Sequence, residues 1–107
     1  MDIKTIAAYL QLEEEEAGEL VELFISTTLS DMNKIRDAVR FNDFENAAGA
    51  AHSIKGAASS MGLDRISSLA GQAETLAKEE DFDQMEEMLG RLKREIASLS
   101  RRTEAGN

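Results

Sequence analysis

The sequence has no cysteine, no proline and no tryptophan, and among its 107 residues it carries only one tyrosine and four phenylalanines. Without cysteine the chain has no disulfide, no thiolate nucleophile and no cysteine-bound zinc. The absence of proline and the frequent alanine, leucine, glutamate, lysine and methionine favour helices. The scarcity of aromatic residues predicts an aliphatic core. We therefore expect an all-α fold.

Positive charge and long apolar runs are also scarce. The chain has 12 basic and 21 acidic side chains, so its formal net charge is −9, which repels nucleic-acid phosphates and anionic membranes. No apolar run approaches the roughly 20 residues that span a bilayer, and the N-terminus lacks the pattern of a signal peptide. We expect a soluble, cytoplasmic protein that binds neither nucleic acid nor membrane.

Several motifs of catalytic and metal-binding proteins are missing. The sequence contains neither GxxxxGK[ST] nor GxGxxG, and it has no EF-hand spacing. We therefore predict no ATP site, no metal site and no cofactor in this chain. Carboxylates that are consecutive on a helix diverge, so the run 13–16 is interpreted as a solvated helix face.

Apolar residues recur at helical spacing in five stretches, which predict five helices. Asp2, Asp43, Asp64 and Asp81 stand where N-caps are expected, and Gly62 stands where a helix ends on a left-handed residue. The predicted helices cover about residues 2–10, 16–41, 44–61, 64–79 and 82–101.

Short connections between these helices favour antiparallel neighbours. The sequence therefore predicts one domain, 1–107, built as an antiparallel up-and-down four-helix bundle with a short extra N-terminal helix. Because four amphipathic faces can satisfy one another, we expect a monomer. Both a free-standing protein and a domain excised from a larger kinase fit this sequence.

The single histidine, His52, lies in the third predicted helix. On a wheel of about 100° per residue, the pole opposite His52 is apolar, which predicts an exposed imidazole. That opposite pole consists of Ala47, Ala50, Ile54, Ala57 and Met61. The small residues Ala48, Gly49 and Gly56 stand near the histidine instead of long charged side chains. Two glycines in an exposed helix cost about 2 kcal/mol relative to alanine, so close approach by a partner is a better explanation than stability.

An imidazole is substantially neutral at cellular pH, and one ring nitrogen then offers a lone pair as a nucleophile. Lys55, one turn along, would favour an added phosphoryl dianion, and Ser59 could donate a hydrogen bond to a phosphoryl oxygen. These residues form a candidate phosphoryl-accepting face. A solvated surface role stays open for Lys55, and it is the simpler interpretation of Ser59.

The stretch 51–62, AHSIKGAASSMG, resembles the signature of histidine phosphotransfer (HPt) domains, His-x-Leu/Ile-Lys-Gly followed by an apolar-Gly pair. The resemblance extends over about residues 20–78 and includes Glu74. It implies that His52 is phosphorylated, usually at Nε2, that Lys55 stabilises the phosphoryl group, and that Gly56 admits a receiver domain. The implied partners are response-regulator receiver domains, which would bring Mg²⁺, and a hybrid histidine kinase.

The resemblance thus implies a phosphoryl carrier rather than an enzyme, which accepts the group from one receiver aspartate and passes it to another. Two other interpretations stay open. One is a scaffolding helical bundle in which His52 is incidental. The other is the phospho-accepting domain of a chemotaxis-type histidine kinase, labelled by an ATP-binding domain in trans.

Overall fold

The computed structural model of the protein describes residues 2–104, and within this range it contains helices and no strand. Each helix begins and ends within three residues of the predicted bounds. In chain order the helices are α1 Ile3–Leu10, α2 Glu14–Arg40, α3 Phe44–Ser60, α4 Asp64–Lys78 and α5 Phe82–Glu104.

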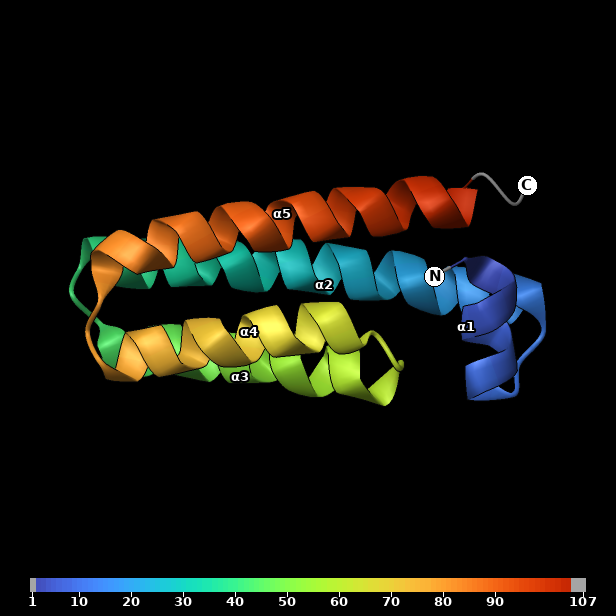
Figure 1. Ribbon diagram of the computed structural model, residues 1–107, viewed down its shortest axis with the longest axis horizontal. Coiled ribbons are helices and arrows are strands. Elements are labelled where there is room, and N and C mark those ends of the chain that lie inside the picture. Colours follow the sequence, from blue (N-terminus) through green and yellow to red (C-terminus); the bar gives the residue numbers. More distant parts are fainter. Residues whose placement is uncertain (1, 105–107) are drawn as a thin grey trace.

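The four longer helices run antiparallel along an elongated body of 42 × 20 × 18 Å (Figure 1). Helix α2 packs on α3, α3 on α4, α4 on α5, and α5 returns to α2, which closes the bundle. The short α1 crosses one end and packs against α2 (Figure 1). The predicted four-helix bundle with an extra N-terminal helix is confirmed.

Local hydrogen bonds fix most of the helix starts. As predicted for N-caps, the carboxylates of Asp2, Asp43 and Asp81 each accept a hydrogen bond from the backbone N–H of the residue three positions later. The prediction for Asp64 was wrong, because Asp64 is already the first residue of α4 and Leu63 precedes it as a cap without a side-chain bond. Asp64 instead contributes negative charge to the first turn, where the helix dipole favours it.

The tight turn between α3 and α4 depends on Gly62, whose φ is +71°. The Gly62 N–H donates to the Ser59 carbonyl at 3.1 Å, and the Leu63 N–H donates to the Ala58 carbonyl at 2.9 Å. This pair of bonds is a Schellman motif, which ends a helix on a left-handed residue, as the sequence predicted. The Tyr9 ring of α1 lies directly over Gly62, in the space that a Cβ would occupy.

Alanines let α3 and α4 approach closely, and these two helices form the most extensive contact of the bundle. Small side chains reduce the distance between helix axes, so polar side chains at the edges of this interface can meet. The alanines that are completely buried here are Ala47, Ala51 and Ala58 on α3 and Ala70, Ala73 and Ala77 on α4.

Two leucines of α2 lie at the surface of the bundle. Leu20 and Leu23 are 40% and 62% exposed. The buried face of α2 includes Val21, Phe24 and Thr28. Across residues 2–104, no helix combines the length and the apolar character that crossing a membrane requires.

Candidate functional site

His52 lies in the middle of α3 with its side chain 65% exposed. The completely buried face of this helix is formed by Ala47, Ala51, Ile54 and Ala58. On a helical wheel their centre lies about 130° from His52, rather than at the opposite pole. The imidazole therefore projects into solvent at the edge of α3 that adjoins α4.

This rotation corrects two of the expected positions on α3. Ala48, which was expected beside His52 on the exposed face, is only 9% exposed, and Ala57, which was expected in the core, is exposed. The reason is that α3 packs most extensively on α4, which turns its buried arc toward that helix. As a buried side chain, Ala48 is a poor candidate for direct docking of a partner.

Glu74 on α4 joins three side chains of the site. Its Oε2 lies 3.1 Å from His52 Nδ1, and its Oε1 accepts a hydrogen bond from Lys55 Nζ at 3.0 Å. Lys78, one turn further along α4, places its Nζ 3.4 Å from the same Oε2 that meets the imidazole. One carboxylate thus holds the histidine and two lysines together.

The environment of Glu74 keeps this carboxylate ionised. Its side chain is 12% exposed, and the hydrogen bond from Lys55 lowers the pKa of Glu74, which burial by itself would raise. The positive charges of Lys55 and Lys78 lower the same pKa further. Glu74 is therefore a fixed negative charge beside the imidazole at neutral pH.

A carboxylate without a proton can only accept hydrogen bonds. Its contact with His52 therefore requires the proton of a neutral imidazole to be on Nδ1. The lone pair then belongs to Nε2, the ring nitrogen that Glu74 does not contact. This arrangement selects the tautomer in which Nε2 is the nucleophile.

The aliphatic part of the Lys55 side chain lies close to Gly71 of α4. A Cβ added to Gly71 would come within 3.3 Å of Lys55 Cδ, so the absence of a side chain there makes room for the lysine. On the same helix Ser67 donates a hydrogen bond from Oγ to the Lys55 carbonyl at 3.2 Å. Lys55 is thereby directed along α4 toward Glu74.

The two glycines near His52 face open space. A Cβ added to Gly49 or Gly56 would meet no heavy atom of residues 2–104 within 4 Å. Packing among residues 2–104 therefore does not require a glycine at either position. Because no side chain projects from Gly49 or Gly56, a partner surface can approach the backbone of α3 closely beside the imidazole.

A family model for the Hpt domain matches residues 19–102, which is most of the chain. The chain belongs to the Hpt domain family. The resemblance that the His52 motif carries is confirmed. The phosphorelay intermediate protein rdeA of Dictyostelium discoideum is 25% identical over 91 residues, or 85% of this chain. The chain spans only 36% of the length of that relative. No solved structure matched the chain.

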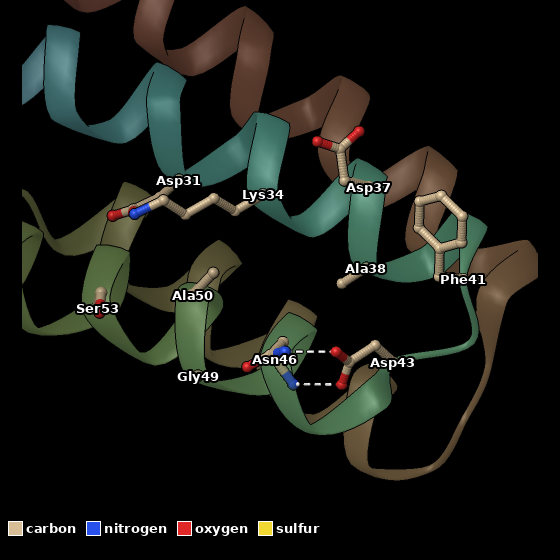
Figure 2. Close-up of a pocket in the computed structure, with 10 residues that line it drawn as sticks. All are labelled: Asp31, Lys34, Asp37, Ala38, Phe41, Asp43, Asn46, Gly49, Ala50 and Ser53. Atoms are coloured by element: carbon tan, nitrogen blue, oxygen red, sulfur yellow. Dashed lines mark hydrogen bonds and ion pairs between the residues drawn. The ribbon is translucent and has the colours of Figure 1, made fainter.

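Two hollows flank the exposed face of this Hpt domain. One, of about 610 Å³, lies between α3 and α4 and is bordered by Gly49, His52, Glu74 and Lys78. The other, of about 530 Å³, lies between α2 and α3 (Figure 2). Gly49 borders both hollows, so a partner seated against α3 at this glycine would reach the two of them.

The α2–α3 hollow carries polar groups that pair with one another. Figure 2 shows Asp43 bonded to Asn46 at one end, and Asp31 lies 3.7 Å from Lys34 on α2, across from Ser53 of α3. His52 is not among the residues that line it. The polar groups of the α2–α3 hollow are therefore separate from the Glu74 cluster, which consists of Glu74, His52, Lys55 and Lys78.

Among the predicted site residues of the Hpt domain, the structure brings His52 and Lys55 together through Glu74. Ser59 is exposed one turn beyond Lys55 and, in the described part of the chain, does not join this cluster. No role for Glu74 or Lys78 was predicted from the residues themselves. Their signal is an i, i+4 acid–base pair on an otherwise alanine-rich helix, which becomes informative only with the register of α4 against α3.

Proposed function

We propose that this Hpt domain accepts a phosphoryl group on Nε2 of His52 from the aspartyl phosphate of a receiver domain and passes it to another receiver. The observation that supports this most strongly is the His52–Glu74 contact of 3.1 Å, which leaves the Nε2 lone pair free on an exposed ring. The name of the relative, phosphorelay intermediate protein, supports the same assignment.

In the proposed step, the Nε2 lone pair attacks phosphorus, and a nitrogen–phosphorus bond forms as the oxygen–phosphorus bond of the aspartyl phosphate breaks. The electron pair of that bond leaves with the receiver carboxylate. The Nδ1 proton stays in place, and the Glu74 carboxylate stabilises the positive charge that the ring acquires. The same charge makes the imidazole a good leaving group in the reverse reaction, so transfer can proceed in both directions.

Lys55 is the proposed partner of the transferred phosphoryl group. Its Nζ contacts the same Glu74 carboxylate as the imidazole does. The Lys55 side chain is 40% exposed, so it can turn toward a group on Nε2. A lysine cation stabilises a phosphoryl dianion by direct charge attraction. Ser59, which stands outside the Glu74 cluster, is proposed only as a more distant hydrogen-bond donor.

Gly49 and Gly56 are the proposed docking positions for the receiver, because a bulky side chain at either would stand in open space beside His52. We propose that the receiver also supplies Mg²⁺, which neutralises charge on the transferring group. In this proposal the Hpt domain has no cofactor, no ATP site and no kinase activity of its own. It acts as a cytoplasmic monomer between a hybrid histidine kinase and receiver domains.

Transfer of labelled phosphate tests this function. Receiver domains from the source organism, each phosphorylated with a labelled small phosphodonor, are mixed with the chain and with its His52→Gln variant. We expect label on the chain that is stable in base and lost in acid, and no label on the variant, with equal helicity by circular dichroism. Label that persists in the variant would place the acceptor elsewhere.

The same experiment separates the alternatives. A scaffolding bundle would take no label from any receiver domain. A phospho-accepting domain of a chemotaxis-type kinase would take label from a kinase catalytic domain with ATP, but not from phosphorylated receivers. Our proposal requires label from at least one phosphorylated receiver.

A further inference from the structure

Lys78 has a place in the site that its sequence position does not reveal. It is 26 residues from His52 and on another helix, yet both side chains contact Glu74 Oε2, at 3.4 and 3.1 Å. Lys78 Nζ therefore lies no more than 6.5 Å from His52 Nδ1. Its side chain is 67% exposed, so the ammonium group is free to move from the carboxylate toward a neighbouring anion.

Lys78 and Lys55 approach the imidazole from different directions. Lys55 follows His52 by one turn on α3, and it contacts the other oxygen of Glu74. Lys78 lines the α3–α4 hollow together with Phe44 and Ala48, which precede His52 on α3, and Lys55 is not among the lining residues. The hollow leaves space beside the ring on the side of Lys78.

We propose that Lys78 is a second phosphoryl-binding cation. In the unphosphorylated chain Glu74 pairs with Lys55 and Lys78, and both lysines move from this carboxylate to the phosphoryl group once His52 is phosphorylated. This inference rests on the proposed phosphoryl transfer to His52. A phosphoryl group carries close to two negative charges at neutral pH, whereas Glu74 carries one, so the group attracts both lysines more strongly than the carboxylate does.

Movement of Lys78 to the phosphoryl group would also change what Glu74 binds. In the unphosphorylated chain this carboxylate pairs with both His52 and Lys78. Glu74 Oε2 is shared between the Nδ1 proton of His52 and the ammonium group of Lys78. When Lys78 turns to the phosphoryl group, Oε2 remains for the Nδ1 proton alone. The phosphorylated ring is then positively charged and bonds to the carboxylate, while both lysines face the phosphoryl oxygens.

Phosphotransfer kinetics of the full chain test the role of Lys78. The rate of transfer from a phosphorylated receiver is measured for the wild type, Lys78→Gln and Lys78→Arg. Arg91→Gln is the matched control, because Arg91 also pairs with a glutamate four residues before it, at 3.1 Å, but on α5. We expect Lys78→Gln to transfer about fivefold more slowly, with Lys78→Arg close to the wild type and Arg91→Gln unchanged.

A second background distinguishes contact with the phosphoryl group from positioning of Glu74. If Lys78 acted only by holding Glu74, the effect of Lys78→Gln would vanish in a Glu74→Gln chain. We expect the fivefold effect to persist there. Its disappearance, or wild-type kinetics of Lys78→Gln in an otherwise active chain, overturns the role of Lys78 and leaves the proposed function intact. A wild-type chain that takes no label overturns both.

Discussion

Substitution of Gly56 separates the needs of folding from those of docking. Gly56 lies inside α3, and in the described part of the chain an added Cβ would meet no heavy atom within 4 Å. Replacing a helix-interior glycine by alanine stabilises a helix by about 1 kcal/mol. For a domain of roughly this size, that gain raises the melting temperature by about 4–8 °C. Leucine, which has nearly the same helix propensity, should stabilise the chain by a similar amount.

Transfer should respond in the opposite direction. If a receiver surface seats against α3 at this glycine, a leucine there must be accommodated by displacement, which costs about 1–3 kcal/mol in a packed interface. We therefore expect Gly56→Leu to slow transfer by a factor of about 5 to 150. Gly56→Ala should lie between the leucine variant and the wild type.

The assays are thermal unfolding followed by circular dichroism and the rate of label transfer from a phosphorylated receiver. Gly18→Ala is the matched control, because a Cβ at Gly18 also meets no atom of the described residues within 4 Å, but Gly18 lines the groove between α2 and α5. It should stabilise the chain and leave transfer unchanged. A Gly56→Leu chain that is destabilised yet fully active would refute the reasoning.

Two further predictions concern stability. Gly62→Ala should lower the free energy of unfolding by at least about 1 kcal/mol, because φ is +71° at this residue and the new Cβ would lie 2.9 Å from the Tyr9 ring. Urea unfolding of the wild type and the variant measures this difference. An unchanged unfolding midpoint would contradict the turn geometry. Glu74→Gln should lower stability by about 1 kcal/mol at pH 7. The pKa of Glu74 is lower in the folded chain than in the unfolded chain. The contribution of this carboxylate to stability is therefore complete above the ordinary glutamate pKa of about 4.3, and it is lost as the pH falls through the lowered pKa of the folded state. The difference between wild type and variant should therefore shrink in acid, and a difference that grows in acid would show that the ion pairs do not stabilise the fold.

The fold was predictable because its determinants are local. Helix periodicity, the caps at Asp2, Asp43 and Asp81, and the left-handed turn at Gly62 each depend on residues within a few positions of one another. The N-cap predicted at Asp64 was wrong, since an acid can interact favourably with the helix dipole from the first turn as well as from the cap.

The rotation of α3 about its axis was harder to predict, because alanine occurs on every side of this helix. Ala48 and Ala57 have the same side chain, and only packing against α4 decides which of them is buried. A wheel centred on His52 assumes that the core lies opposite it. The structure moves the histidine toward the α3–α4 edge, where Glu74 is within reach.

The partners of His52 could not be assigned from spacing for a related reason. Glu74 is 22 residues away, and its meeting with His52 depends on the close alanine interface and on the turn that sets the register of α4. Lys78 follows from Glu74 by one helical turn. A single sequence contains these residues but not the register that brings them together.

The nitrogen that carries phosphate is the most direct test of the account. Nitrogen-15 and phosphorus-31 NMR of the labelled chain, loaded by a catalytic amount of receiver with excess phosphodonor, identifies the phosphorylated ring nitrogen of His52. We expect a proton on Nδ1 before loading and, after loading, phosphorus bonded to Nε2 with the Nδ1 proton retained. Phosphate on Nδ1, or on a residue other than His52, would contradict it.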